Sequence, residues 1–150
     1  MRIYEAKVSY QLMSDGLAEV IDTIEQAAAY LKSAFEERPL QESIYLIMLN
    51  RKNKPLGRHL VSIGSMTSAM ASAKEVFRPA LLAGAAGIII AHNHPSGDPA
   101  PSAGDISFTR HIREAAKIME ISMIDHVIIG NAKDDPDGVG FYSFRAKGLV

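Results

Sequence analysis

The sequence predicts a single α/β domain, of the α+β kind, in which helices flank a mixed central β-sheet. Short apolar segments rich in β-branched residues alternate along the chain with segments of helical periodicity, which is typical of a layered α/β structure. The chain has 150 residues, enough for one substantial core, and its 47% apolar and 22% charged residues are typical of a globular domain. We find no linker rich in Pro, Gly or Ser that would divide it into two domains.

The first forty residues predict a strand and a helix that extend the main domain. Residues 2–12 alternate polar and apolar side chains well enough for a strand. From Leu17 to Phe35 the apolar residues recur at steps of three and four, which predicts an amphipathic helix. We therefore assign residues 1–40 to an N-terminal extension and residues 41–150 to the main domain.

In the main domain, strands are predicted where short apolar runs stand between turn residues, and helices where apolar residues follow a helical period. The predicted strands are residues 42–50, 58–64, 86–91, 123–130 and 139–148, and the predicted helices are residues 72–85 and the segment around residues 108–119. The first two strands are expected to pair as a hairpin. Pro79 indicates that the first of these helices is kinked or starts late, and Gly84 is expected to end it.

Charge and cysteine content exclude several classes of protein. Sixteen basic and seventeen acidic residues give a net charge of −1, so the chain as a whole offers no electrostatic case for nucleic-acid binding. The absence of cysteine excludes disulfides, thiolate metal sites and a cysteine nucleophile, and it agrees with a cytoplasmic location. Residues 1–13 lack the apolar segment of a signal peptide, and the longest apolar stretch, residues 80–91, is too short to span a bilayer. We expect no membrane association.

Two histidines and an aspartate enclose a loop that follows an apolar strand. In a strand, residues i and i+2 point to the same side, so His92 and His94 project together and Asn93 faces away if the strand continues that far. The loop is long enough to return Asp105 to the same point. Two imidazoles and one carboxylate would leave a fourth zinc position open for water, as catalysis requires. Ser102 and Asp105 also fit a helix N-cap, and the two interpretations are compatible.

The segment from residue 92 to 105 resembles the motif of the JAMM (MPN+) metalloproteases: His-x-His-Pro, a gap of six residues, then Ser-x-x-Asp. The segments EVFRPAL, AHNHPSGDPAPS, DHVIIG and FYSF resemble the bacterial RadC family in particular, over about residues 40–150. This resemblance implies a RadC-like JAB/MPN domain with the cytidine-deaminase-like architecture. It also implies one catalytic Zn²⁺ held by His92, His94 and Asp105.

The same resemblance implies catalytic roles for two further residues. In proteins of the JAMM type the general base is a glutamate that opens a buried strand upstream, and Glu42, at the head of ESIYLIML, matches that placement. Ser102 would hydrogen-bond the oxyanion that develops on the scissile carbonyl. Taken alone, Glu42 would be interpreted as an exposed residue at a strand end. Glu75 is the rival base, but its helical segment favours a solvated face or a salt bridge.

Other polar residues are expected to have structural or solvated positions. Asp125 and His126 start a buried strand, and we expect them to support the fold or to support a metal ligand from behind. His59 and His111 have no partner at a suitable spacing and are expected at the surface. The acidic segment 131–138 predicts a solvated turn rather than a calcium loop, because it lacks the regular acidic spacing of an EF-hand.

Three functions are compatible with these features. The complete set of ligands and base favours a zinc-dependent peptidase or isopeptidase that acts on a peptide or protein substrate. A DNA-repair accessory is the alternative that the RadC resemblance implies, although the near-neutral charge and the absence of a helix-hairpin-helix signature in residues 1–40 do not favour direct DNA binding. An interaction domain with a purely structural metal is the third. The sequence predicts neither the substrate nor the oligomeric state.

Overall fold

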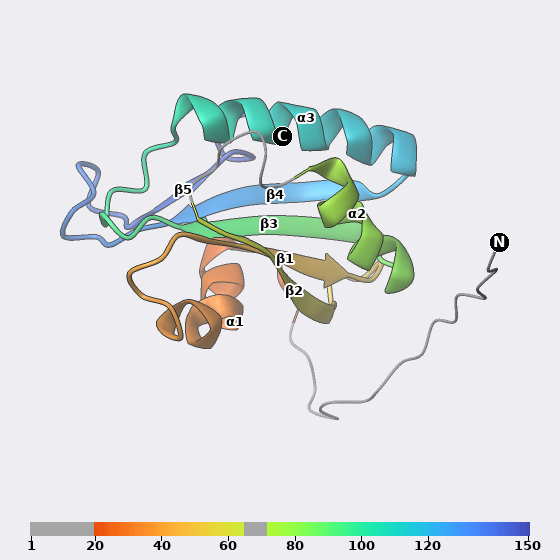
Figure 1. Cartoon of the computed structure of the whole chain (residues 1–150), viewed down its shortest axis with the longest axis horizontal. Coiled ribbons are helices and arrows are strands. Elements are labelled where there is room, and N and C mark those ends of the chain that lie inside the picture. The colour runs from red at the N-terminus through yellow and green to blue at the C-terminus, as the bar shows by residue number, and fades with distance from the viewer. Residues whose placement is uncertain (1–19, 65–71) are drawn as a thin grey trace, which may run out of the picture.

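The computed structural model describes residues 20–64 and 72–150, and within them one five-stranded mixed sheet organises the fold (Figure 1). The strands are β1 (Ser43–Leu49), β2 (Pro55–Ile63), β3 (Gly87–Asn93), β4 (Ser122–Ile129) and β5 (Phe141–Ser143), in the order β2-β1-β3-β4-β5. β3 and β4 are parallel, and the other neighbouring pairs are antiparallel. The helices in these ranges are α1 (Ile24–Glu36), α2 (Ala73–Leu82) and α3 (Ala103–Met119). The predicted single α+β domain with a mixed sheet is confirmed.

Each face of the sheet has its own hydrophobic cluster, because successive strand residues point to opposite sides. α1 packs on the face that carries Ile47 and Ile89. α2 and α3 pack on the other face, which carries Ile88 and Ile90 (Figure 1). Both central strands, β1 and β3, are buried along their whole length. His92 is the next residue of β3 on the α3 face, so the strand itself directs this imidazole under the helix.

Local sequence explains the two connections that matter for the site. The β1–β2 hairpin turns at Asn50, whose side-chain oxygen accepts the N–H groups of Lys52 and Lys54 at 2.8 and 3.1 Å. The parallel pair β3–β4 needs a long crossover, which α3 provides with 17 residues. This crossover carries the chain from the end of β3, through the loop and back over the sheet.

The predicted start of the first helix is wrong. α1 begins at Ile24 rather than near Leu17, because Thr23 forms a capping box with Gln26. The Gln26 N–H donates to Thr23 Oγ1 at 3.3 Å, and Gln26 Oε1 accepts the Thr23 N–H at 3.0 Å. The predicted strand of residues 2–12 lies outside the described residues.

The last predicted strand is much shorter than expected. β5 covers only Phe141–Ser143 instead of residues 139–148. After Ser143 the chain turns, with the Ala146 N–H donating to Ser143 Oγ at 3.0 Å and the Lys147 N–H donating to the Ser143 carbonyl at 3.3 Å. The alternating side chains of FYSF extend into this turn, which is why the pattern suggested a longer strand.

The helix that contains Pro79 does not start late. α2 begins at Ala73, and Pro79 lies inside it. Gly84 follows the C-cap residue with a φ of +64°, a conformation that glycine adopts without strain, so the predicted C-terminal end is confirmed.

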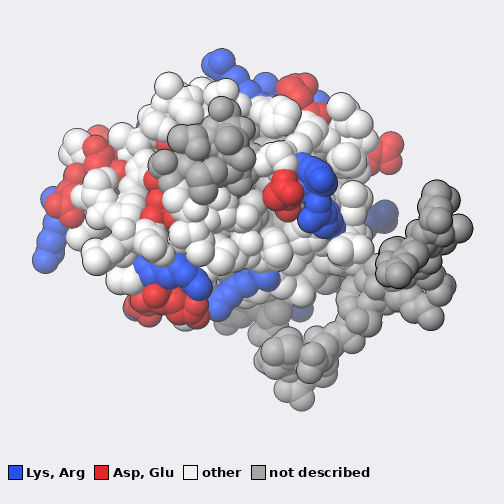
Figure 2. Space-filling view, viewed as in Figure 1, with Lys and Arg blue, Asp and Glu red and all other residues white. Residues whose placement is uncertain are grey.

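The surface carries mixed charge. On the face drawn in Figure 2, Lys and Arg side chains lie interspersed with Asp and Glu side chains. His59 and His111 are exposed, as predicted. Among the helices formed by residues 20–64 and 72–150, none combines the length and the apolar composition that a bilayer span requires.

Candidate metal centre

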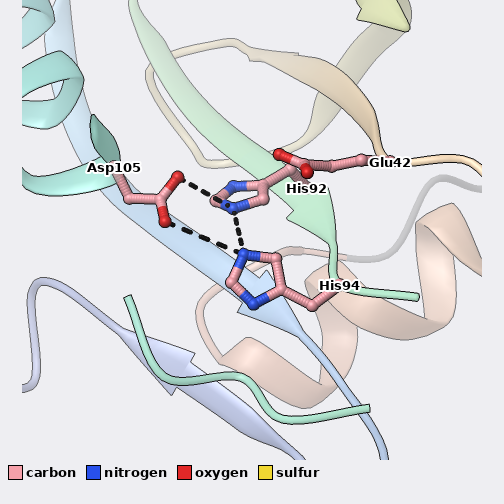
Figure 3. Close-up of side chains that lie close together, drawn as sticks. All are labelled: Glu42, His92, His94 and Asp105. Atoms are coloured by element: carbon pink, nitrogen blue, oxygen red, sulfur yellow. Dashed lines mark hydrogen bonds and ion pairs between the residues drawn. The ribbon is translucent and has the colours of Figure 1, made fainter. Parts of the chain in front are cut away.

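Four side chains with ligand atoms meet at one end of the sheet (Figure 3). The nearest ligand atoms of Glu42, His92, His94 and Asp105 all lie within 4.8 Å of one another. His92 Nε2 lies 3.1 Å from His94 Nε2 and 3.2 Å from Asp105 Oδ1, and His94 Nε2 lies 3.7 Å from Asp105 Oδ2. The structure thus brings together the three residues predicted as metal ligands and the residue predicted as general base.

Strand register explains how Glu42 reaches the histidines. In the antiparallel pair β1–β3, Ile44 lies opposite His92. Directly paired residues of neighbouring strands point to the same face. Two residues further along this face, the chain carries Glu42 beside β1 and His94 beside β3. The alternation that places His92 and His94 together therefore also places a carboxylate next to them.

Asn93, between the two histidines, holds the backbone around Glu42. Its Oδ1 accepts the Ser43 N–H at 2.8 Å, and its Nδ2 donates to the Gln41 carbonyl at 3.1 Å. Ser43 and Gln41 flank Glu42, so one side chain fixes the chain on both sides of the candidate base. The sequence predicted only that Asn93 faces away from the histidines, and no spacing signal pointed to this clamp.

Asp105 enters the cluster from the first turn of α3, where Ser102 is the N-cap. The Ser102 N–H and hydroxyl both donate to Asp105 Oδ2, at 2.7 and 2.6 Å, and the Asp105 N–H donates back to Ser102 Oγ at 3.1 Å. The predicted N-cap is confirmed, and it fixes the rotamer that presents the other carboxylate oxygen, Oδ1, to His92. In this conformation the Ser102 hydroxyl is engaged with Asp105, so its role toward an oxyanion stays a prediction.

The loop after β3 fixes the orientation of His94. His94 Nδ1 lies 2.8 Å from the Asp98 carbonyl, which can only accept, so Nδ1 donates. The loop packs closely on the segment after β4, where the Asn131 N–H donates to the Gly97 carbonyl at 2.6 Å. A Cβ at Gly130 would collide with that carbonyl. Glycine at this position lets the loop approach and hold the His94 ring.

Several features of the cluster fit a divalent cation. Asp105 Oδ1 is buried and has no hydrogen-bond partner, although His92 Nε2 lies 3.2 Å away, which is consistent with a lone pair rather than a proton on that nitrogen. An unpaired buried carboxylate oxygen is costly unless a cation or proton lies against it. Two imidazole nitrogens 3.1 Å apart likewise require a proton or a cation between them. Histidine nitrogen and carboxylate oxygen are ligands that zinc prefers.

The charges of the cluster also favour a bound cation. The nearby Asp105 carboxylate raises the pKa of His94 above its ordinary value, against the effect of burial. Burial would raise the pKa of Asp105, but the polar contacts of its carboxylate, the hydrogen bonds from Ser102 among them, outweigh burial and hold that pKa well below its usual range. Asp105 is therefore ionised, and it gives the pocket the negative charge that attracts a cation.

Glu75 and the acidic segment 131–138 lie outside the cluster. Glu75, the rival base, accepts a hydrogen bond from the Ser72 hydroxyl and pairs with Arg78 at 3.7 Å, so the predicted salt bridge is confirmed. The acidic segment 131–138 forms a turn in which the Asp135 carboxylate accepts three backbone N–H groups. Neither contributes to the group of metal-binding side chains.

Asp125 and His126 support the site from inside the fold. The Asp125 carboxylate accepts the Ser143 hydroxyl at 2.6 Å and the N–H groups of His126 and Arg145 at 2.7 and 2.9 Å, which ties β4 to the turn after β5. Its predicted structural role is confirmed. His126 is fully buried, and its Nε2 lies 2.9 Å from His92 Nδ1. Burial lowers the pKa of His126 well below its ordinary value, so the ring is neutral.

The mixed sheet and the three helices of residues 20–64 and 72–150 are consistent with a JAB/MPN-type fold, which carries here a possible metal-binding group of Glu42, His92, His94 and Asp105. The family model of the RadC-like JAB domain matches residues 21–149, and the chain belongs to this family. The match includes α1. The predicted boundary at residue 40 stays a prediction.

Similar proteins carry the family name UPF0758. The chain is 40% identical to a UPF0758 protein of Geobacter sulfurreducens over 126 residues, which are 84% of this chain and 52% of the relative. It is 45% identical to one of Carboxydothermus hydrogenoformans over 93 residues, 62% of this chain and 41% of the relative. A third, of Geobacillus thermodenitrificans, is 42% identical over 110 residues, 73% of this chain and 46% of the relative. The chain thus spans about half the length of the curated relatives it matches.

Proposed function

We propose that the protein is a zinc-dependent metallohydrolase, a peptidase or isopeptidase that cleaves an amide bond in a peptide or protein substrate. One observation carries the proposal: the buried Asp105 Oδ1, which has no hydrogen-bond partner, lies 3.2 Å from His92 Nε2, His94 Nε2 lies 3.1 Å from that nitrogen, and a Glu42 ligand atom lies within 4.8 Å. Three protein ligands leave a zinc position open for water, and a carboxylate beside that position is suited to proton transfer. The resemblance to the JAMM metalloproteases supports the same assignment.

In this proposal His92, His94 and Asp105 hold one zinc ion, and two further side chains act on the substrate. When bound, the ion supplies Lewis acidity, which polarises an amide carbonyl and makes a water molecule more acidic. Glu42 takes the proton of the attacking water on a carboxylate oxygen and passes it to the nitrogen of the leaving amine.

Ser102 is the candidate donor to the developing oxyanion. Its hydroxyl must rotate away from Asp105 Oδ2 to reach a substrate. The carboxylate keeps a donor during this rotation, because the Ser102 N–H also donates to Oδ2 at 2.7 Å. The same residue can therefore hold Asp105 through its backbone and stabilise the oxyanion through its side chain.

The test combines metal analysis with cleavage of a peptide library. We expect the untagged protein to bind one zinc ion per chain, and Glu42→Gln to keep that ion while cleavage falls at least about 100-fold, the typical contribution of a general base. Glu75→Gln, which removes a carboxylate outside the cluster, should cleave like the wild type. Failure of the wild type to bind a metal, or full cleavage by Glu42→Gln, would contradict the proposal.

Metal analysis also addresses the identity of the ion and a second candidate function. Two histidines and one carboxylate also suit ferrous iron, so the metal must be identified rather than assumed. Because a Glu42 ligand atom lies within 4.8 Å of the others, Glu42 could instead close the site as a fourth ligand. Loss of the ion from Glu42→Gln would favour such a structural metal.

No contact among residues 20–64 and 72–150 favours the DNA-repair alternative. The mixed charge on the face in Figure 2 gives no basic surface there for a phosphate backbone. A salt-sensitive mobility shift of DNA by the purified chain would favour the alternative. The cytoplasmic location, expected from the cysteine-free sequence, stays a prediction.

A further inference from the structure

A chain of buried hydrogen bonds runs behind His92, on the side of the ring that faces away from the cluster. His92 Nδ1 lies 2.9 Å from His126 Nε2, and His126 Nδ1 lies 2.6 Å from Thr109 Oγ1. Thr109 Oγ1 in turn lies 2.6 Å from the backbone carbonyl of Asp105. His92, His126 and Thr109 are all at most 1% exposed, so water does not compete for these contacts.

The direction of every bond in this chain follows from its last member. The Asp105 carbonyl can only accept, so the single proton of the Thr109 hydroxyl points to it. Thr109 Oγ1 must then accept from His126 Nδ1. The His126 ring is fully buried and its two nitrogens contact Thr109 and His92 rather than a carboxylate, so it carries a single proton and Nε2 keeps a lone pair. That lone pair accepts the proton of His92 Nδ1. His92 Nε2 is consequently left with a lone pair, and it is the nitrogen that points to Asp105 and His94 (Figure 3).

We propose that Thr109 and His126 are positioning residues that lock His92 in the tautomer whose Nε2 lone pair faces the metal site. The inference rests on the proposed function for the metal, but the tautomer is a property of the protein alone. We call this chain of hydrogen bonds, from the backbone carbonyl of Asp105 through Thr109 and His126 to the ring of His92, the relay. It therefore couples two candidate ligands, from α3 and β3, through one residue of β4.

The packing around His126 suits this role. The His126 ring stacks on Phe144 with a centroid distance of 4.7 Å and an interplanar angle of 7°, and Phe108 meets it edge-on at 5.9 Å. Phe144 is itself fully buried. A ring held between two aromatic side chains keeps its nitrogens aligned with Thr109 on one side and His92 on the other. Hydrogen bonds to the second nitrogen of a metal-binding histidine fix its tautomer and raise its basicity.

A purely structural role of the same residues makes a different prediction. His126→Phe keeps an aromatic ring against Phe144 but removes both hydrogen bonds. Thr109→Val keeps the volume of the side chain but removes the hydroxyl, whereas Thr109→Ser keeps the hydroxyl. If packing alone mattered, Thr109→Val would perturb the site less than Thr109→Ser.

The test measures zinc affinity by competition with a chromophoric chelator, and the tautomer of His92 by ¹⁵N NMR of the ring nitrogens. We expect the wild type to carry the proton of His92 on Nδ1, both without metal and with zinc. Zinc affinity should fall about 10- to 100-fold in Thr109→Val and in His126→Phe, the range seen when partners of metal ligands are removed, and stay within about threefold in Thr109→Ser. Tyr45→Phe removes a buried hydroxyl that donates to the Ala34 carbonyl on the opposite, α1 face of the sheet, and it should leave zinc affinity unchanged.

The outcomes separate this inference from the proposed function. If the wild type binds no metal, the proposed function fails. The tautomer of His92 in the metal-free protein still shows whether the relay holds this ring as proposed. A proton on Nε2 of His92 in the metal-free wild type overturns the relay. The relay is also overturned if Thr109→Val and His126→Phe both bind zinc as tightly as the wild type does. Should either variant fail to give a dispersed NMR spectrum, the wild-type tautomer alone decides.

Discussion

Asn93 Oδ1 accepts the backbone N–H of Ser43 at 2.8 Å, across the pair of strands that carries the candidate metal centre. The residue that separates the two histidines thus fastens the strand that presents Glu42. Backbone hydrogen bonds of the β1–β3 ladder set the register, and this side chain extends the pairing beyond Ile44, opposite His92. The distance between the candidate base and the candidate metal ligands therefore depends on an amide that contacts none of their side chains.

Replacing this amide should loosen the end of β1. In Asn93→Ala the buried Ser43 N–H loses its acceptor, a loss that costs about 1–3 kcal/mol. We expect hydrogen exchange of the Ser43 amide to accelerate roughly 5- to 150-fold, the rate equivalent of that cost. NMR-detected exchange measures it. Asn50→Ala, which removes a side-chain amide from the turn at the other end of β1, is the control and should leave the Ser43 N–H protected. Equal exchange of the Ser43 N–H in the wild type and in Asn93→Ala would refute the role of Asn93.

Asp105 and Ser102 should differ in their effects on metal binding. Asp105→Ala removes a proposed ligand and should abolish stoichiometric zinc binding. Ser102→Ala removes only the hydroxyl bond to Oδ2 and leaves the backbone N–H bond in place, so we expect weaker zinc binding without its loss. Because the Ser102 cap is also lost, stability should fall by about 1 kcal/mol. Zinc titration and urea unfolding measure the two effects, and full zinc occupancy of Asp105→Ala would refute the ligand set.

The sequence predicted the parts of the site that depend on local geometry. The spacing of His92 and His94 places both rings on one face by the alternation of a strand alone, and Ser102 with Asp105 follows the pattern of a capped helix start. Glu42 is different. Its approach depends on the register between β1 and β3, which no local pattern encodes, so it was reached only through the resemblance to a known motif.

The structural features that the sequence does not predict depend either on contacts between distant elements or on a helix cap. Asn93 and Thr109 gave no signal because their partners lie on other elements. Periodicity predicts too early a start for the first helix because Ile21 is apolar and lies at a helical spacing. Ile21 nevertheless packs into the core from the non-helical segment before the cap. Periodicity reports which side chains are buried, whereas Thr23 decides where the helix begins.

A methyl group at Gly130 should weaken metal binding without touching a ligand. Its Cβ would collide with the Gly97 carbonyl and the Pro99 ring, which would displace the loop that accepts the proton of His94 Nδ1. We expect zinc affinity of Gly130→Ala to fall by about tenfold or more, as for loss of other contacts that orient a ligand. Gly57→Ala, where a Cβ would make only ordinary contact with Met48, is the control. Unchanged affinity in Gly130→Ala would show that the loop does not position His94.

Asp105 and His94 together should stabilise the metal-free protein most in mildly acidic solution. The pKa of His94 is raised above its ordinary 6.5, so its contribution to stability is complete below that pH and is lost as pH rises through the folded-state pKa. The pKa of Asp105 is lowered from 3.8, so its contribution is present above that pH and is lost only as pH falls through the folded-state value. Both contributions are therefore present between these two ordinary values.

In urea unfolding of the metal-free protein, the buried His126, whose pKa is lowered, reduces the midpoint near pH 5.5, whereas His94 adds a difference of the opposite sign, a higher midpoint near pH 5.5 than near pH 8.5. Asp105→Asn should lose most of this difference, because Asp105 is the main cause of the raised His94 pKa. His111→Ala, which removes an exposed histidine, should retain it. An Asp105→Asn variant whose midpoint changes with pH as that of the wild type does would contradict the assigned charges.

Zinc affinity should follow pH in the opposite sense to this stability. Binding requires the lone pair of His94 Nε2, so below its folded-state pKa each ion must displace one proton from His94. Affinity should therefore rise about tenfold per pH unit up to that pKa and then level off, since the low pKa of Asp105 keeps its carboxylate ionised throughout. Chelator competition between about pH 5.5 and pH 8 measures the slope. A zinc affinity independent of pH across this range would show that the His94 proton does not occupy the position of the ion.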